Sequence, residues 1–592
     1  MNQEKRRCQN CKEDFVIEPE DFQFYEKIQV PAPTWCPECR SQRRMTWRNE
    51  RNLYKTKCVL SGREIITCFS PDSRIVVYDR DIWWSDKWDP LSYGVDYDFS
   101  KPFFVQFREL LGRQPMPSLF NSRCVNSEYG NHNGEAKNAY LVFASWNVEN
   151  LSYCSKIMNS KDSMDVLTGG ELELCYEAVN SNGCYRSAFI ENCESCVDSF
   201  FLYSCKGCTN CFGCTNLRNK TYYFFNQPCG KDEYIKKLEQ LNLGSYDNLS
   251  RSGEEFSRFK QMALRKYANT QNCQNVTGEN LSHVADSKEC FDISDEVRNC
   301  AFLNNGGITL NDSYDGYGVG ASSELVYESV DTGANGRKFF FDIFVWTGED
   351  VFYSYASHGC HNCFACIGLR NKQYCILNKQ YTKEEYEELV PRIIAHMNTM
   401  PYVDSKGRIY KYGEFFPPEL SPFAYNETIA QEYFPLSRNE AEAQGYRWKD
   451  QETRDYKITK TPTELPDHIK DVKDDILNEI IGCSHEGKCN EQCTTAFKII
   501  PQELQFYKRM NLPLPRLCPN CRHYQRLKQR NPLKLWHRKC QCAGEKSENG
   551  VYQNTISHQH GEGKCPNEFE TSYAPDRKEI VYCETCYNAE VV

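Results

Sequence analysis

The sequence predicts a mainly β protein, in which a duplicated parallel β-solenoid (β-helix) is flanked by N- and C-terminal zinc-ribbon modules of treble-clef type. Residues 11–58 and 493–540 align without a gap at an offset of 482, with 19 of 48 positions identical. The middle of the chain is also duplicated, at an offset of 152. Within the first middle copy, short strand-prone segments broken by Asn, Gly, Ser or Asp begin near Asn138, Lys161, Gly183 and Lys206. A period of about 23 residues suits one coil of a solenoid.

The composition is that of a globular protein with several domains. The chain has 592 residues, a net charge of −10 and 26% charged residues, so it is neither a polybasic nor a disordered protein. It contains no run of about 18 apolar residues, and its first residues lack the apolar core of a secretory signal. We therefore expect a cytoplasmic protein whose 34 cysteines bind metal or pack inside the fold, because disulfides are rare in that compartment.

Residues 1–57 form the first predicted zinc ribbon. Two Cys-x2-Cys knuckles, Cys8 with Cys11 and Cys36 with Cys39, are separated by apolar, strand-prone runs. Four thiolates at this spacing suit one tetrahedral zinc ion, with Zn–S bonds of about 2.3 Å. The alternative is that the four thiols are reduced and only pack, a role that double knuckles of this spacing rarely have.

A basic segment follows the second knuckle. A helix that begins there would carry Arg40, Arg43, Arg44 and Arg48, and its N-terminal dipole would favour the thiolates. These arginines are candidates for neutralising the phosphates of a nucleic acid. The alternative is a solvated helix face whose positive charge balances a four-thiolate zinc site.

Residues 58–120 are predicted to be a degenerate, metal-free ribbon-like unit that echoes the last module of the chain. Asp79 and Ile82 stand where the last module has Cys583 and Cys586. The two cysteines that remain in the segment cannot complete a structural metal site. We expect aromatic packing around its tryptophans to hold this unit together.

Residues 121–245 are predicted to be the first solenoid copy with a capping helix, and residues 246–400 the second copy with its helices. The segments 208–220 and 360–372 match at nine of thirteen positions. Duplicated acids occur at Asp162, Asp165, Asp312 and Asp315. Because parallel β-helices often act on polysaccharides, these acids raise the alternative of a carbohydrate-active enzyme. An Asp-Ser-x-Asp corner, however, more often caps backbone amides in a turn.

The first copy also contains four closely spaced cysteines, Cys205, Cys208, Cys211 and Cys214. Close Cys spacing is typical of iron–sulfur and zinc sites. The duplicate, however, has Ser357 in the fourth place, and the spacing coincides with the strand pattern. We interpret these cysteines as small apolar side chains in the solenoid interior.

Residues 401–482 are predicted to be an aromatic, proline-rich connector, and residues 483–539 a second zinc ribbon. The predicted zinc ligands of this ribbon are Cys489, Cys493, Cys518 and Cys521. Between Arg516 and Lys539 there are many basic residues and no acid. The candidate nucleic-acid contacts are Arg522, Arg526, Lys528 and Arg530.

Residues 540–592 form the third predicted zinc module. Cys583 and Cys586 are a knuckle, and the other two ligands come from Cys540, Cys542 and Cys565. We favour Cys542 with Cys565, since Cys540 aligns with the orphan Cys58 of the metal-free unit, although the choice among the three stays open. Its two histidines, His558 and His560, are expected to be exposed loop residues.

Several motifs of the end modules are shared with known proteins. They are C-x2-C-x3-F-x-I at 8–17, F-Y-x-K at 24–27, C-P-x-C-R at 36–40 and S-Y-A-P-D-R-x-E-I-V-Y-C-x-x-C-Y at 572–587. With these motifs the chain resembles the uncharacterised bacterial proteins that carry a "probable zinc-ribbon" domain. The resemblance covers about 200 residues and implies zinc and a small treble-clef-like fold, without a known activity.

Together these observations predict a zinc-binding, non-enzymatic binding or scaffold protein with about three structural zinc ions. Its terminal ribbons are expected to contact nucleic acid or a nucleoprotein complex. The alternatives are a pure protein–protein scaffold and a β-helix enzyme acting on carbohydrate. No membrane partner is expected, and the sequence does not predict an oligomeric state.

Overall fold

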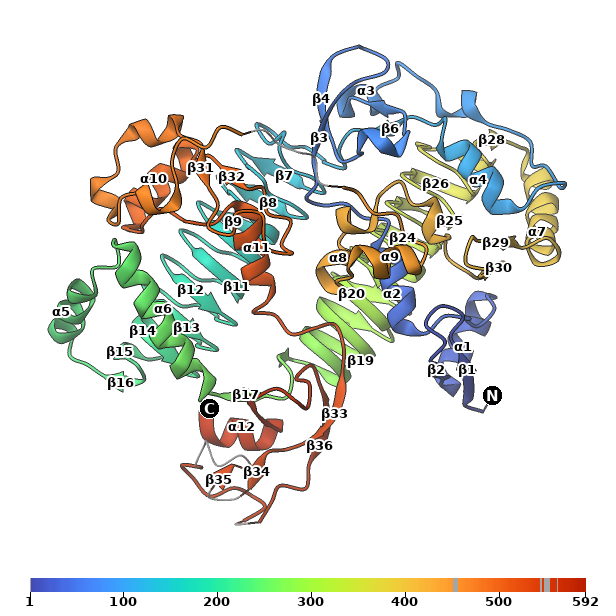
Figure 1. Ribbon diagram of the computed structural model, residues 1–592. Helices are drawn as coiled ribbons and strands as arrows, with labels where there is room; N and C mark the ends of the chain where they lie inside the picture. Colours follow the sequence, from blue (N-terminus) through green and yellow to red (C-terminus); the bar gives the residue numbers. More distant parts are fainter. Residues whose placement is uncertain (1, 451–455, 544–545, 548–553, 562) are drawn as a thin grey trace. The chain divides into compact units, whose positions relative to one another are not determined.

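The computed structural model describes residues 2–450, 456–543, 546–547, 554–561 and 563–592. The chain divides into two compact units, each assembled from distant parts of the sequence (Figure 1). Unit 1 comprises Met1–Phe120, Ala268–Asp450 and Leu533–Leu535. Unit 2 comprises Asn121–Tyr267, Gln451–Pro532 and Trp536–Val592.

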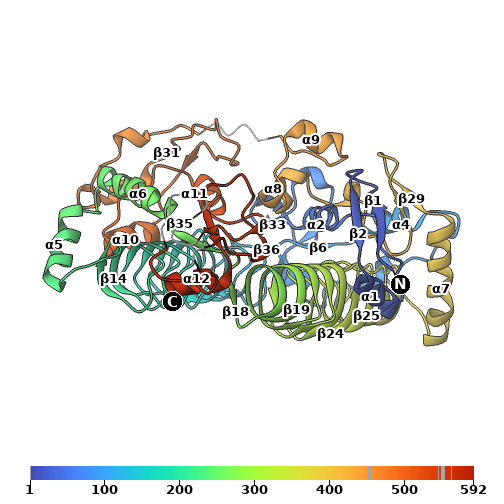
Figure 2. The same cartoon turned by 90° about the horizontal axis from the view of Figure 1, so that it is seen from below.

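The chain is mainly β, and each unit is built on one long sheet of short strands. In both sheets the strands pair in parallel, for the most part each with the next along the chain (Figure 2), and one antiparallel strand closes the end. The first ladder, in unit 2, consists of β7 (Gly134–Lys137), β8 (Trp146–Glu149), β9 (Ser155–Lys161), β10 (Met164–Gly170), β11 (Tyr176–Asn182), β12 (Ala188–Glu191), β13 (Phe200–Tyr203), β14 (Thr209–Thr215), β15 (Thr221–Phe224) and β16 (Gln227–Pro228).

The second ladder belongs to unit 1 and repeats this arrangement. Its strands are β18 (Thr270–Gln271), β19 (Gln274–Arg298), β20 (Ala301–Gly307), β21 (Leu310–Asn311), β22 (Tyr314–Tyr317), β23 (Ser323–Val330), β24 (Gly333–Phe340), β25 (Trp346–Phe352), β26 (His358–Phe364), β27 (Gln373–Ile376) and β28 (Lys379–Gln380). The predicted duplication of a parallel β body therefore appears as two ladders.

The rungs of the first ladder are half as long as expected, so the predicted period is wrong. Ala188 lies opposite Phe200, and Phe200 lies opposite Phe212. The predicted period therefore covers two rungs. The physical reason is a corner at every third residue: from Asn138 to Phe225 each third residue has a positive φ. Asn, Asp and Gly, which tolerate this left-handed conformation best, recur at that spacing and are the sequence signal for it.

Side chains at equivalent corners stack from rung to rung. Asn126 Nδ2 donates to Asn138 Oδ1 and Asn138 Nδ2 to Asn150 Oδ1, both at 3.1 Å, and Asn150 Nδ2 donates to Asp162 Oδ1 at 2.9 Å. Each amide thus accepts from one rung and donates to the next. Asparagine ladders of this kind stabilise stacked parallel strands.

The second ladder has longer rungs at its start. Tyr314 lies opposite Tyr327, whereas Phe339 lies opposite Val351, so the earlier rungs contain one more residue than the later ones. Gly307 and Gly320 stack in the longer rungs with φ values of 125° and 141°. A Cβ on Gly320 would lie 1.8 Å from the Gly307 carbonyl oxygen, so this stack needs glycine.

Cysteines line the interior of the first ladder. The thiols predicted to pack, Cys205, Cys208, Cys211 and Cys214, are fully buried. Each Sγ lies 3.2–3.5 Å from the carbonyl oxygen two residues earlier, to which the thiol donates. Within the described part of the chain they join no group of three or more candidate metal ligands.

The remaining elements form small modules and helices. Unit 1 adds β1 (Glu4–Arg7), β2 (Asp14–Ile17), α1 (Pro19–Ile28), α2 (Pro37–Met45), β3 (Tyr54–Lys57), β4 (Glu64–Thr67), β5 (Val77–Tyr78), α3 (Arg80–Trp83), α4 (Phe103–Leu111), β6 (Met116–Pro117), α7 (Lys383–Thr399), β29 (Tyr402–Val403), β30 (Ile409–Tyr410), α8 (Ala430–Tyr433) and α9 (Arg438–Ala443). Unit 2 adds α5 (Lys231–Leu241), α6 (Tyr246–Gln261), β17 (Leu264–Lys266), β31 (Ile481–Gly482), β32 (Ala496–Phe497), α10 (Pro501–Met510), α11 (Pro519–Leu527), β33 (Trp536–Lys539), β34 (Cys542–Ala543), β35 (Lys546–Ser547), β36 (Glu568–Thr571), β37 (Ile580–Tyr582) and α12 (Glu584–Val591).

The compact units divide the sequence at other positions than the predicted domains do. The segment 401–482 is shared between the units at Asp450 and Gln451, and its residues 451–455 lie outside the described residues. Helix α6, expected to begin the second copy, belongs with the first ladder in unit 2. None of the helices in the described residues has both the length and the apolar character to cross a membrane.

Candidate metal centres and the arginine–carboxylate contacts

The first tetrad is Cys8, Cys11, Cys36 and Cys39, whose Sγ atoms all lie within 4.8 Å of one another. Cys8 follows β1, and Cys36 is the N-cap residue of α2. The Cys11 and Cys36 sulfurs are 3.8 Å apart, about the separation of two thiolates on a tetrahedral zinc ion. The Cys36 amide donates to Cys8 Sγ at 3.3 Å, and the helix N-terminus favours negative charge there. The four residues expected as ligands are thus brought together.

The second tetrad contains Cys483 in place of the expected Cys489. Its members are Cys483, Cys493, Cys518 and Cys521, all buried. The Cys483–Cys521 and Cys493–Cys518 sulfur distances are both 3.9 Å. The Cys518 amide donates to Cys483 Sγ at 3.3 Å, as the Cys36 amide does to Cys8. Cys483 is therefore the counterpart of Cys8.

An insertion explains why Cys483, and not Cys489, completes this tetrad. Two residues separate Cys8 from Cys11, but nine separate Cys483 from Cys493. In both modules the first cysteine directly follows a strand, and that strand pairs with the strand just beyond the second cysteine. Cys489 lies inside the inserted loop, so its close spacing to Cys493 does not make it the knuckle partner.

The third tetrad contains Cys540 in place of the expected Cys542. Its members are Cys540, Cys565, Cys583 and Cys586, all buried. The Cys565 and Cys583 sulfurs are 3.9 Å apart, and the Cys583 amide, at the N-cap of α12, donates to Cys540 Sγ at 3.2 Å. The hydrogen bond from the Cys540 thiol lowers the pKa of Cys583 to about 4, which favours the thiolate form that binds zinc.

The unit predicted to be metal-free repeats the geometry of the third module but keeps only one of its four tetrad cysteines. Cys58, Ser61, Asp79 and Ile82 stand where the third tetrad has Cys540, Cys565, Cys583 and Cys586. The Asp79 amide donates to Cys58 Sγ at 3.2 Å, which repeats the Cys583–Cys540 contact. Burial would raise the pKa of Cys58, but hydrogen bonds from the Asp79 amide and the Ser61 hydroxyl lower it overall. Among the described residues no group of three candidate ligands forms around Cys58.

The basic residues predicted to contact nucleic acid lie mainly in the interior. Six of the eight are at most 3% exposed, namely Arg40, Arg43, Arg44, Arg48, Arg522 and Arg526. The Lys528 side chain is 65% exposed and pairs with Glu491, while Arg530 is half-buried. Side chains without solvent access cannot contact a phosphate, so the six arginines do not form the expected surface. A run of basic residues does not form a basic surface when neighbouring elements place acidic side chains against it.

In unit 1 the arginines of α2 bind acids of the second ladder. Arg40 donates through Nε and Nη2 to the two carboxylate oxygens of Asp315, each at 2.9 Å. Arg44 Nη1 contacts Asp315 Oδ1 at 3.1 Å and Glu328 Oε2 at 2.8 Å. All four side chains are at most 2% exposed. Two-pronged pairs of this kind fix orientation as well as charge.

Two further arginines complete this network. Arg43 donates to Glu328 and to Glu414, each at 2.9 Å. Arg48 donates to Glu50 at 2.8 Å. Burial raises the pKa of the Glu328 carboxyl, and the guanidinium groups of Arg43 and Arg44 oppose that shift. The network therefore offsets the cost of burying each charge with a partner of opposite sign.

In unit 2 the arginines of α11 make the equivalent contacts with the first ladder. Arg522 Nη1 lies 3.1 Å from Asp165 and 3.3 Å from Glu503. Arg526 Nη1 lies 2.9 Å from Asp165 and 2.8 Å from Glu177. Burial raises the pKa of Glu177 to about 7, with Asp165 adding to the rise and Arg526 opposing it.

These contacts repeat because the distance between arginines four residues apart on the helix is similar to the distance between neighbouring rungs of the ladder. The ladder presents an aromatic residue, an Asp and a Glu at the same corner of three successive rungs, Tyr153, Asp165 and Glu177 in the first ladder and Phe302, Asp315 and Glu328 in the second. Rungs are about 4.8 Å apart, and residues four apart on a helix rise by about 6 Å. Arg522 lies 4.7 Å from the Tyr153 ring and Arg40 5.2 Å from the Phe302 ring.

The duplicated acids form structural contacts, either with basic side chains or with neighbouring rungs. Asp165 and Asp315 are fully buried beneath the arginines. Asp162 ends the asparagine ladder, and Asp312 pairs with Lys27 at 3.0 Å. A polysaccharide at the ladder surface cannot reach Asp165 or Asp315, two of the four duplicated acids that raised the alternative of a carbohydrate-active enzyme.

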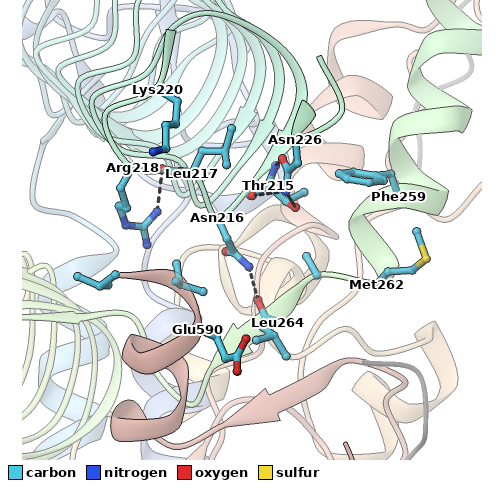
Figure 3. Close-up of a pocket in the computed structure, with 13 residues that line it drawn as sticks. Thr215, Asn216, Leu217, Arg218, Lys220, Asn226, Phe259, Met262, Leu264 and Glu590 are labelled. Atoms are coloured by element: carbon cyan, nitrogen blue, oxygen red, sulfur yellow. Dashed lines mark hydrogen bonds between the residues drawn. The ribbon is translucent and has the colours of Figure 1, made fainter. Parts of the chain in front are cut away.

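A cavity of about 440 Å³ lies in unit 2 (Figure 3). It is lined by the last rungs of the first ladder, the end of α6 and the end of α12. Its polar side chains hold these elements together: Asn216 Nδ2 donates to the Leu264 carbonyl at 3.0 Å, and Arg218 Nη2 to the Tyr587 hydroxyl at 3.3 Å. Glu590 on its wall binds His558 at 2.8 Å.

Comparisons with known proteins do not supply a function. No family model and no curated protein matches the chain. A crystal structure of a "putative acetyltransferase" from Desulfovibrio desulfuricans G20 aligns with 49% of this chain and 86% of its own, at 10% identity and a TM-score of 0.09. Such a similarity carries no argument about fold or activity.

Proposed function

We propose that the protein is a zinc-stabilised, non-enzymatic scaffold in which cysteine modules fasten helices to two β-solenoids. In the first ladder, the constant register of consecutive parallel strands supports the solenoid description. Sulfur separations of 3.8–3.9 Å in the tetrads suit zinc, since tetrahedral thiolate sites prefer this ion. The resemblance of the end modules to zinc-ribbon proteins points to the same metal.

The observation that carries the proposal is the position of the arginines beside each metal centre. Arg40 directly follows Cys39, and Arg522 directly follows Cys521. Both guanidinium groups point into a ladder and bind an aspartate there. A metal that orders the first turn of the helix therefore also places the side chain that fastens the module to the ladder. The role of the metal is therefore structural. The outer faces of the ladders are the surfaces on which we expect partners to bind.

We further propose a reducing, cytoplasmic setting, because none of the 34 cysteines forms a disulfide in the structure. Because the arginines of α2 and α11 are buried, we expect the partner of this scaffold to be a protein or a protein complex rather than a nucleic acid bound through these helices. Binding of a nucleic acid elsewhere on the protein is tested by a mobility-shift series.

The test uses the full-length protein purified under reducing conditions. We expect zinc in at least the three tetrads, and after removal by a chelator we expect faster hydrogen exchange in the rungs around Asp165 and Asp315. Metal-free protein whose exchange equals that of the purified form would overturn the structural role. A mobility-shift series with single- and double-stranded DNA and RNA should show negligible retardation. Retardation that weakens steeply with salt would instead favour a nucleic-acid partner.

A further inference from the structure

Two modules contain more metal ligands than one ion needs. Beside the third tetrad, Cys542, His558, His560 and Cys586 have ligand atoms within 4.8 Å of one another. Cys586 belongs to both groups. Beside the second tetrad, His485, Cys489, Glu491 and Cys521 form such a group, and Cys521 is shared in the same way.

We propose that Cys586 and Cys521 are bridging thiolates, each joining the zinc ion of its tetrad to a second zinc ion. The inference rests on the proposed zinc content of the tetrads and goes beyond it. The second ion of the third module would be held by Cys542, His558, His560 and Cys586. That of the second module would be held by His485, Cys489, Glu491 and Cys521.

The distances in the third module match a Cys2His2 site. Cys542 Sγ lies 3.1 Å from His558 Nδ1 and 3.4 Å from His560 Nε2, and Cys586 Sγ lies 3.4 Å from His560 Nε2. A tetrahedral zinc ion with Zn–S bonds of about 2.3 Å and Zn–N bonds of about 2.0–2.1 Å separates sulfur and nitrogen ligands by about 3.5 Å. The four atoms are therefore spaced as ligands.

The outer ring nitrogens of both histidines already have acceptors. His558 Nε2 contacts Glu590 Oε1 at 2.8 Å, and His560 Nδ1 contacts the Gly563 carbonyl at 2.9 Å. Each outer nitrogen thus carries the proton, and the inner nitrogens present lone pairs toward Cys542. Metal-binding histidines typically have such carboxylate or carbonyl partners. Asn554 Nδ2 donates to Cys542 Sγ at 3.1 Å, which favours the thiolate.

Independent evidence comes from the second module. His485 Nδ1 and Glu491 Oε2 are buried atoms that make no hydrogen bond, and they lie 3.2 Å apart, within ion-pair distance when the imidazole is protonated. Cys489 Sγ lies 3.7 Å from Cys521 Sγ, the spacing of two thiolates on one zinc ion. Buried polar atoms that make no hydrogen bond are costly, and a cation bound by both atoms would offset that cost with the imidazole neutral.

The extra ligands occur only where the first knuckle is interrupted. The uninterrupted Cys8–Cys11 knuckle has no second group among the described residues. The insertion after Cys483 supplies His485, Cys489 and Glu491, and the longer one after Cys540 supplies Cys542 and both histidines. The insertions thus bring ligands to an existing metal centre.

The test is zinc stoichiometry in the full-length protein. The proposal predicts about five zinc ions per chain, one in the first module and two in each of the others. His558→Ala with His560→Ala should lower the count by about one, and Cys489→Ser should do the same. The control His537→Ala, an exposed histidine on β33, should leave the count unchanged. About three ions with no response to these variants would overturn the inference and leave the proposed function intact, whereas a metal-free protein would overturn both.

X-ray absorption on the unmodified protein keeps the test valid if a variant fails to fold. Tetrads alone give purely sulfur coordination. The second sites add about one nitrogen or oxygen neighbour per zinc and metal–metal scattering at about 3.5–4 Å. Purely sulfur coordination without a metal–metal signal would overturn the proposal.

Discussion

Arg40 and Asp315 form a buried, two-pronged ion pair across 275 residues of sequence, with both contacts at 2.9 Å. The pair joins the helix beside the first cysteine tetrad to the middle of the second ladder. Its counterpart is Arg522 with Asp165 at 3.1 Å. One attachment thus occurs twice, each time between a module and the ladder of its own unit.

The first prediction concerns this pair. Arg40→Met should destabilise unit 1 by about 3–5 kcal/mol, since it leaves Asp315 buried beside a single remaining arginine. Arg40→Met combined with Asp315→Leu should cost less than the sum of the single changes. Denaturant unfolding followed by tryptophan fluorescence measures both. The exposed pair Lys5–Asp14 is the control, for which Lys5→Met should change stability by less than about 1 kcal/mol.

The second prediction is a pH dependence from Glu177. Its pKa in the fold is about 7, against an ordinary value of 4.5, so folding favours its protonated form. The stabilisation from this group is complete below about pH 4.5 and is lost as the pH rises through 7. Glu177→Gln should therefore raise the melting temperature relative to the native protein increasingly between pH 5 and 8. A pH-independent difference, or an equal effect of Glu173→Gln on the exposed side of the same ladder, would contradict it.

The third prediction concerns the glycine stack of the second ladder. Gly320→Ala should destabilise unit 1 severely, because its Cβ would lie 1.8 Å from the Gly307 carbonyl oxygen. Gly407→Ala is the matched control: Gly407 also has a positive φ, 77°, but open space around it. It should cost only the left-handed backbone conformation, about 1 kcal/mol. Thermal unfolding of the two variants separates steric clash from backbone preference.

The fourth prediction concerns the asparagine ladder. Asn138→Gly removes two rung-to-rung hydrogen bonds but keeps the left-handed corner, and it should cost about 1–2 kcal/mol. Asn138→Ala loses the same bonds and also strains the corner, so it should cost about 1 kcal/mol more. Hydrogen exchange of the neighbouring rungs should rise in that order. Identical exchange in both variants would show that the corner conformation is unstrained by alanine.

Repeats and cysteine spacing allowed much of this architecture to be predicted. The duplicated middle, the mainly β character and the four ligands of the first module follow from residues close together in sequence. The rung length was wrong because a period close to two rungs was taken for one coil. Asn at 126, 138 and 150 carries the true period.

The sequence by itself determined that cysteines gather at both ends, because a knuckle is a local motif whose ligands are only a few residues apart. Tertiary structure alone decided that Cys483 and Cys540 complete the tetrads, since insertions separate them from their partners along the chain. It also decided the role of the arginines. The sequence predicts a basic, exposed helix, but its arginines are buried because Asp165 or Asp315, which is far away in sequence, lies opposite them. Charge is a property of a residue, but a charged surface depends on which other residues the fold places beside it.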